Sequence, residues 1–229
     1  MIPIIKKDKS HFLFNALLNK EEISLIKNYI GKKISYLWLE QLNLLLKPNV
    51  RISCMGKCNF QFAGNKLETQ HLQFCSHHKE YGTIPSQGGI SFQQVVTKHK
   101  RGIEGLLNPP QFISKSFINK IDYPNQTPIV AIQFYGHKMN ASIKGLDGWA
   151  DVEYFKEIGY ENYPEIDCNS IEFIVFLHEN NLKTIISLET GGFWFNLNYE
   201  KEIDEEIISK SYVIENGYKK NIILHHDVK

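Results

Sequence analysis

The spacing of apolar and polar residues predicts one short helix near the start of the chain. Asn19 is followed three residues later by Glu22, the spacing of a capping box in which each side chain bonds to the other residue's backbone N–H. Isoleucines then recur on one face up to Ile30, and Gly31 can take the left-handed conformation that ends a helix. We therefore expect a helix from Asn19 to Ile30, packed on the first sheet.

Runs of β-branched, aromatic and other apolar residues predict strands along most of the remaining chain. In the first part they lie at residues 33–40, 42–46, 50–54, 59–62, 72–75 and 90–96. In the second part they lie at residues 129–135, 139–143, 171–178, 182–188 and 193–199. Near the end, residues 200–209 have helical spacing, and Asn216-Gly217 is a strong hairpin signal. The pattern is typical of antiparallel β-meanders.

Glycines and prolines interrupt this pattern between residues 101 and 128, which indicates a boundary or a long connection. We expect an α+β fold that is predominantly antiparallel β, with two β-meander parts and a short capped N-terminal helix. The expected parts are a basic β-rich domain at residues 1–122 and an acidic β-rich domain at residues 123–229.

Composition adds that the chain can fold around a sizeable core. Of its 229 residues, 42% are hydrophobic and 12% are aromatic, which excludes a disordered, collagen-like or coiled-coil chain. No apolar run approaches the roughly 20 residues of a membrane-spanning helix, and the first lysines are not followed by the apolar stretch of a secretion signal. We therefore expect a cytoplasmic protein with no membrane partner.

Charge is distributed unevenly, although the net charge is only +1. Residues 1–150 hold 19 Lys and Arg against 9 Asp and Glu, and residues 151–229 hold 7 against 16. The two parts can dock on each other, or one can attract an oppositely charged partner. Only Arg51 and Arg101 among the 26 basic residues are arginine. Because lysine lacks the planar fork that reads guanine, a sequence-specific DNA-binding protein is disfavoured.

The stretch 151–167 combines carboxylates with aromatic rings and has Lys156 as its only cation. Such a surface imitates nucleic acid, since carboxylates stand where phosphates would and aromatic side chains are rigid anchors at interfaces. A basic partner such as a nuclease would be attracted to it. The alternative is a solvated acidic loop whose tyrosines pack on the sheet. The expected partner-binding residues are Asp151, Glu153, Tyr154, Glu157, Tyr160, Glu161, Tyr163, Glu165 and Asp167.

The first predicted strands resemble the opening of several β-rich bacterial families. The resemblance is carried by Ile30-Gly-Lys-Lys-Ile-Ser-Tyr-Leu-Trp38, the leucine-rich strand after it and the turn at Pro48-Asn49. These families include immunity proteins that neutralise polymorphic or contact-delivered toxins. The resemblance implies a protein that binds and occludes a toxin and performs no covalent chemistry.

One cluster contains residue types that bind zinc. Cys54, Cys58, His71 and Cys75 supply the four thiolate or imidazole ligands of a tetrahedral ion. However, three residues between the two cysteines is a less typical spacing than two, and cysteines are often buried for packing reasons alone. We expect no cofactor. A zinc-containing domain or a metal-dependent enzyme built on residues 54–78 is the first alternative.

Common enzyme motifs are missing from the sequence. It lacks the G-x-S-x-G elbow of hydrolases, the H-E-x-x-H of zinc proteases and the glycine-rich loops that cradle nucleotide phosphates. Gly88-Gly89 and Gly191-Gly192 are interpreted as turns or bulges between strands. The leading interpretation is a non-enzymatic inhibitor of a basic protein. A second alternative is a module that binds nucleic acid without base specificity through the lysine-rich first part.

Overall fold

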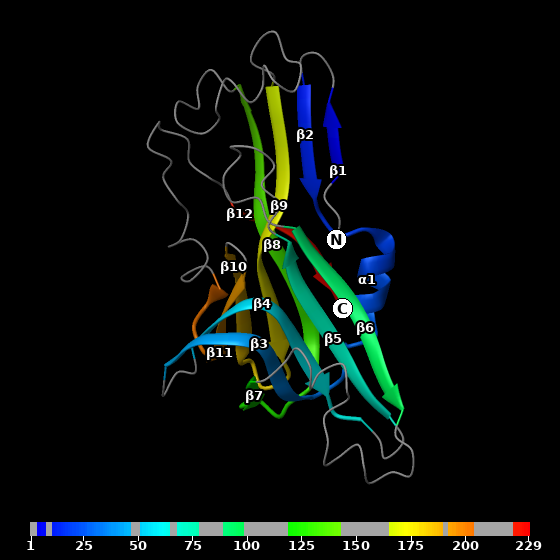
Figure 1. Cartoon of the computed structure of the whole chain (residues 1–229), viewed down its shortest axis with the longest axis vertical. Coiled ribbons are helices and arrows are strands. Elements are labelled where there is room, and N and C mark those ends of the chain that lie inside the picture. Colours follow the sequence, from blue (N-terminus) through cyan, green and yellow to red (C-terminus); the bar gives the residue numbers. More distant parts are fainter. Residues whose placement is uncertain are drawn as a thin grey trace.

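The computed structural model describes residues 4–7, 11–46, 51–64, 68–77, 89–98, 119–142, 165–189, 192–203 and 222–229. In these ranges the chain has one α-helix and twelve strands joined in one sheet, which is antiparallel except where β2 meets β9 (Figure 1). The helix is α1 (Lys20–Lys27), and the strands are β1 (Ile4–Lys7), β2 (His11–Ala16), β3 (Ile34–Leu46), β4 (Arg51–Phe62), β5 (Glu68–His77), β6 (Gly89–Lys98), β7 (Asn119–Asp122), β8 (Ile129–Ser142), β9 (Glu165–His178), β10 (Lys183–Glu189), β11 (Gly192–Tyr199) and β12 (Ile222–Val228). The prediction of a mostly antiparallel β protein with a short N-terminal helix is confirmed.

The helix α1 begins with the predicted capping box. Glu22 N donates to Asn19 Oδ1 at 2.8 Å, and Asn19 N donates to Glu22 Oε2 at 3.0 Å. Both bonds satisfy N–H groups that the first turn of a helix leaves without partners. The helix ends at Lys27, earlier than the predicted Ile30. Gly31 follows the last turn with a φ of 80°, as its predicted role requires.

Neighbouring strands pair largely in chain order. β3, β4 and β5 each pair with the next strand, and so do β8, β9 and β10. The sheet also continues across the predicted boundary at residue 122, because β11 pairs with β4 and β2 pairs with β9. Strands from both sides of that position therefore form one hydrogen-bonded sheet.

The sheet folds back on itself, so that β4 and β5 face β9 across a shared core. The ring centroid of Phe176 on β9 lies 5.1 Å from that of Phe60 on β4 and 6.2 Å from that of Phe74 on β5. Figure 1 shows β5 and β6 crossing in front of β8 and β9, with α1 beside them. Buried side chains of α1 and of both parts of the chain belong to one apolar cluster. Their removal from water is the main stabilising contribution to such a fold.

Glycines are required where β4 bends and where β11 meets it. Gly56 has a φ of 78° and lies beside Glu40, whose Oε2 accepts a 2.9 Å hydrogen bond from Lys57 N. A Cβ at Gly192 would overlap the carbonyl oxygen of Cys54 on the paired strand. At Gly192, the first residue of β11, glycine therefore permits close strand approach.

The sequence pattern missed several strands. β1, β2 and β7 were not expected, and β9 begins at Glu165, earlier than the predicted residue 171. Glu165 and Asp167 therefore lie in a strand, where the sequence had suggested an acidic surface segment or loop. β3 and β4 are also longer than expected, since each joins two predicted strands through a bulge. The expected helix at residues 200–209 and the turn at residues 216–217 fall largely outside the described residues.

Candidate functional site

The predicted acidic–aromatic stretch connects β8 to β9. The residues that lie outside the described ranges are Asp151, Glu153, Tyr154, Glu157, Tyr160, Glu161 and Tyr163. The strands on either side form one long antiparallel hairpin, whose cross-strand pairs run from Ile129 and His178 to Ser142 and Glu165. The residues that flank the connection 143–164, Ser142 and Glu165, are therefore held side by side at the end of this hairpin.

The end of the β8–β9 hairpin belongs to a four-strand extension in the order β1, β2, β9, β8 (Figure 1, top). Glu165 is in register with Ser142 on β8 and with His11 on β2. Asp167 occupies the equivalent position opposite Asn140 and Leu13. The structure thus places two of the predicted acidic residues in this extension.

The four predicted zinc ligands do not share one location. Cys54 pairs with Phe193 on β11, whereas His71 pairs with Gln61 at the other end of β4. At about 3.3 Å per strand residue, positions 54 and 61 are roughly 20 Å apart, too far for Cys54 and His71 to ligate one ion with bonds of about 2 Å. Cys75 pairs with Lys57, next to Cys58. Within the described residues, no three His, Cys, Asp or Glu side chains are close enough to hold a metal ion.

The two cysteines of β4 are thiols buried in the core. Burial raises the pKa of the Cys54 thiol to about 12, the hydrogen bond with the Phe193 backbone opposes this, and the charge of Glu40 adds to it. The thiol is therefore protonated at neutral pH. Because the thiolate is the form that attacks electrophiles and binds metals, Cys54 is expected to be unreactive in the folded chain.

A row of aromatic and amide side chains lies on β3 and β4, on the side that faces away from the core. Lys120 Nζ of β7 lies 3.5 Å from the ring centroid of Tyr36 and 5.4 Å from that of Trp38. Trp38 Nε1 donates a 2.7 Å hydrogen bond to Gln61 Oε1. Asn59, in register with Trp38, is fully buried, yet neither Oδ1 nor Nδ2 has a hydrogen-bond partner among the residues that the structure describes. This arrangement can bind a cation on ring faces.

The sequence held a signal for part of this row. Tyr36 and Trp38 alternate with Leu37 and Leu39, so the aromatic rings point to one side of the strand and the leucines to the core. Lys120 could not have been identified in this way, because only the pairing of β7 with β3 brings it to the rings.

A second polar cluster is buried where β9 turns into β10. Tyr123 Oη bonds to Thr184 Oγ1, and His178 Nε2 lies 3.3 Å from that Tyr hydroxyl and 3.4 Å from Thr184 Oγ1. The carbonyl of Thr127 can only accept, so His178 Nδ1 donates to it, at 3.4 Å. Burial lowers the pKa of His178 to about 4 and raises that of Tyr123, so both side chains are neutral at pH 7. The cluster ties the connection before β8 to the β9–β10 hairpin.

Two asparagines extend this connection towards the surface. Asn125 Oδ1 accepts from Thr127 N at 3.1 Å and from Thr127 Oγ1 at 2.7 Å, while its Nδ2 donates to Asn180 Oδ1 at 3.2 Å. Asn180 Oδ1 also accepts from Leu182 N at 3.2 Å. Asn125 is buried, and each of its side-chain atoms has a partner. These contacts hold two loops together.

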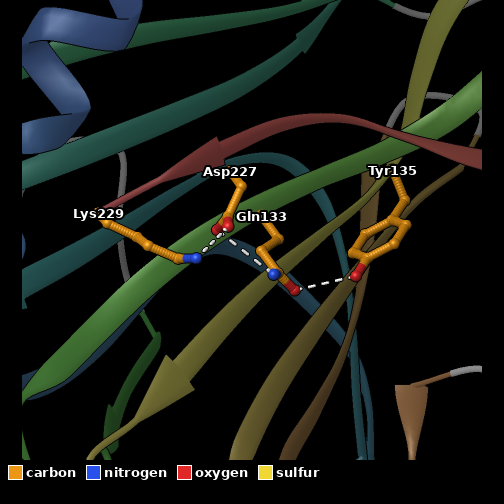
Figure 2. A network of polar contacts seen from close by, with 4 residues as sticks. All are labelled: Gln133, Tyr135, Asp227 and Lys229. Carbon is orange, nitrogen blue, oxygen red and sulfur yellow. Dashed lines mark hydrogen bonds and ion pairs between the residues drawn. The ribbon is translucent and has the colours of Figure 1, made fainter.

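The last described strand is attached to β8 by a surface network. Lys229 Nζ lies 2.7 Å from Asp227 Oδ2, and Gln133 Nε2 donates to Asp227 Oδ1 at 3.3 Å (Figure 2). Tyr135 Oη donates to Gln133 Oε1 at 2.9 Å. Because the ion pair is exposed, its stabilising effect is small. The position of β12 is set by its backbone pairing with β8, and the surface network offers no reactive group.

Comparison of the chain with protein-family models, with curated proteins and with solved structures gives no match. In the described ranges, no helix has both the length and the apolar character needed to span a membrane.

Proposed function

We propose that the chain is a non-enzymatic binding protein of the immunity or inhibitor type. It occludes a basic protein, such as a nuclease toxin, in the cytoplasm. The acidic–aromatic stretch 151–167 is the proposed contact surface. The resemblance of the first strands to immunity proteins and the chemistry of this stretch support the proposal.

The structural observation that carries the proposal is the pairing of Ser142 with Glu165. This pair brings both ends of the connection 143–164, which contains most of the stretch, to one place on a four-strand extension, so the sheet can present that connection as one surface. A binding segment attached to a rigid element loses less conformational entropy when it binds than one attached to a flexible chain.

The charge of the connection favours a basic partner. Residues 143–164 contain five Asp and Glu against two Lys, and Glu165 and Asp167 follow directly. A concentration of one charge sign accelerates association with a partner of the opposite sign and disfavours partners of the same sign. Tyrosines between the carboxylates would then determine how long the complex lasts.

The proposal keeps the two-part organisation, with a basic part at residues 1–122 and an acidic part at residues 123–229. Two runs of strands that pair in chain order, β3–β6 and β8–β11, support two meander parts. In this arrangement the acidic part presents the contact surface.

The experiment measures association with basic nuclease domains, starting with any toxin-like protein encoded beside this gene. Reversing Glu153, Glu157 and Glu161 to Lys should slow association by at least tenfold at low salt and abolish protection of cells from the toxin. The effect should shrink as salt screens the charges over about 8–10 Å.

A matched control reverses Glu179, Glu200 and Glu202 to Lys, since these three side chains are exposed and lie outside the stretch. This control changes the net charge by the same amount and should leave the association rate within about twofold. If both triple variants slow association equally, the stretch is not the contact surface.

A further inference from the structure

Two aromatic side chains on the outer side of β3 hold an ammonium group. Lys120 Nζ lies 3.5 Å from the Tyr36 ring centroid and 5.4 Å from the Trp38 ring centroid. A cation within about 6 Å of a ring face is attracted by the negative charge density of that face. The two rings therefore form a cation site, and the chain's own lysine fills it.

The Trp38 ring is held in place by a hydrogen bond, whereas the lysine is exposed. The 2.7 Å bond from Trp38 Nε1 to Gln61 Oε1 fixes the indole, and Trp38 is only 8% exposed. Tyr36 is half-buried beside it, whereas Lys120 is exposed on a strand of four residues. Moving the ammonium into water would leave the ring faces unchanged.

The charges around the rings also favour a cation. Asp122, which is exposed, is in register with Tyr36. Glu40 follows Trp38 on the same strand, and its carboxylate is oriented by the hydrogen bond from Lys57 N. Once Lys120 has left, two carboxylates and two rings remain on this face.

We propose that Tyr36 and Trp38 bind a lysine side chain of the partner protein and that Lys120 occupies their place in the free chain. The inference rests on the proposed function, because it takes the partner to be basic. On binding, the partner's ammonium replaces that of Lys120, which moves into solvent. The outer face of β3 is then a second contact, in addition to the stretch 151–167.

The test uses the full ¹⁵N-labelled chain and an octalysine peptide. The chain has three tryptophans, and Trp149→Phe and Trp194→Phe assign two indole N–H signals and leave the third to Trp38. Octalysine should shift the Trp38 signal, and octaglutamate should not. Lys120→Ala should lower the apparent Kd by at least threefold, because it removes the internal competitor, and Tyr36→Leu should abolish the shift.

A control separates this competition from a general change of charge. Lys27→Ala removes one positive charge from an exposed position on α1 and should lower the Kd by less than twofold. The inference is wrong if Lys27→Ala and Lys120→Ala lower the Kd for octalysine equally. It is also wrong if octalysine does not shift the Trp38 signal of the Lys120→Ala variant.

The same titration separates this inference from the proposed function. Trp149 lies two residues before Asp151, so its signal reports on the acidic stretch. A shift of Trp149 alone supports the acidic surface and overturns the β3 site. A shift of Trp38 that persists in the Glu153, Glu157 and Glu161 to Lys variant supports the β3 site independently of the acidic surface.

Discussion

The hydroxyl of Tyr123 and Nε2 of His178 lie 3.3 Å apart in the buried core, although 55 residues separate them in the chain. Thr184 completes the contact from the next strand. Hydrogen bonds of this kind add modest net stability when they form, but leaving one buried group without a partner is costly. Substitutions in this cluster should therefore be among the most destabilising in the fold.

Tyr123→Phe should lower the free energy of unfolding by about 1–3 kcal/mol. The ring contact with Phe60 is kept, but His178 and Thr184 lose a buried hydroxyl partner. Tyr135→Phe is the matched control, because it removes one hydroxyl from a half-buried ring bonded to Gln133 and should cost less than about 1 kcal/mol. Urea unfolding measures both. Equal losses of unfolding free energy would show that the buried Tyr123 hydroxyl contributes no more to stability than the half-buried Tyr135 hydroxyl.

His178 should make stability depend on pH between about 4 and 6.5. Burial lowers its pKa to about 4 from an ordinary 6.5, and the hydrogen bond to Thr127 opposes the shift. Between these values the unfolded chain binds a proton that the folded chain does not, so stability is full above about pH 6.5 and falls as the pH decreases to about 4. The shift corresponds to roughly 3 kcal/mol.

His178→Gln tests this because glutamine forms hydrogen bonds and does not titrate. Carboxylates contribute to acid destabilisation in both proteins, so the difference between them isolates the histidine. From pH 7.5 to 4.5 the wild type should lose more unfolding free energy than the variant. Parallel curves would mean that His178 does not remain neutral in the folded chain.

Gly56 and Gly31 have nearly the same φ, 78° and 80°, but different surroundings. A Cβ at Gly31 has nothing within 4 Å, whereas a Cβ at Gly56 meets the Glu40 carboxylate. Gly31→Ala should cost about 1 kcal/mol from backbone strain alone. Gly56→Ala should cost about 1–2 kcal/mol more, because Glu40 must leave Lys57 N. In a Glu40→Ala background this excess should disappear in a double-mutant cycle measured by thermal unfolding.

Local interactions explain why some elements could be predicted. Asn19 and Glu22 are three residues apart, so the capping box that they form can be recognised without knowledge of the rest of the fold. β2 pairs locally with β1, but it also pairs in parallel with β9, whose residues are more than 150 positions later, as with His11 and Glu165. No local pattern encodes such a partner.

The candidate sites, too, could be predicted only as far as they depend on residues close together in the sequence. Cys54 and His71 have suitable chemistry for zinc, but strand register determines their separation, and register follows from pairing across the whole sheet. The alternation of Tyr36 and Trp38 could be read from the sequence, whereas the position of Lys120 over their rings could not. No local sequence pattern could have predicted the buried contact between Tyr123 and His178 either.

Asn59 and Asn125 should respond in opposite directions to the same substitution. Both are buried, at 0% and 3% exposure, but Asn125 bonds to Thr127 and Asn180, whereas neither polar side-chain atom of Asn59 has a partner among the described residues. Burying an amide without a hydrogen bond costs about 1–3 kcal/mol, and leucine avoids that cost with a branched side chain of similar size. Asn59→Leu should therefore raise the free energy of unfolding by about 1 kcal/mol.

Asn125→Leu should lower the free energy of unfolding by at least about 2 kcal/mol, because it removes bonds to two loops and leaves their polar groups without partners. Urea unfolding of both variants gives the comparison. A loss of stability in Asn59→Leu similar to that in Asn125→Leu would mean that the Asn59 amide is hydrogen-bonded in solution, and a bound water is the simplest partner. In that case the amide would stabilise the sheet beneath Trp38.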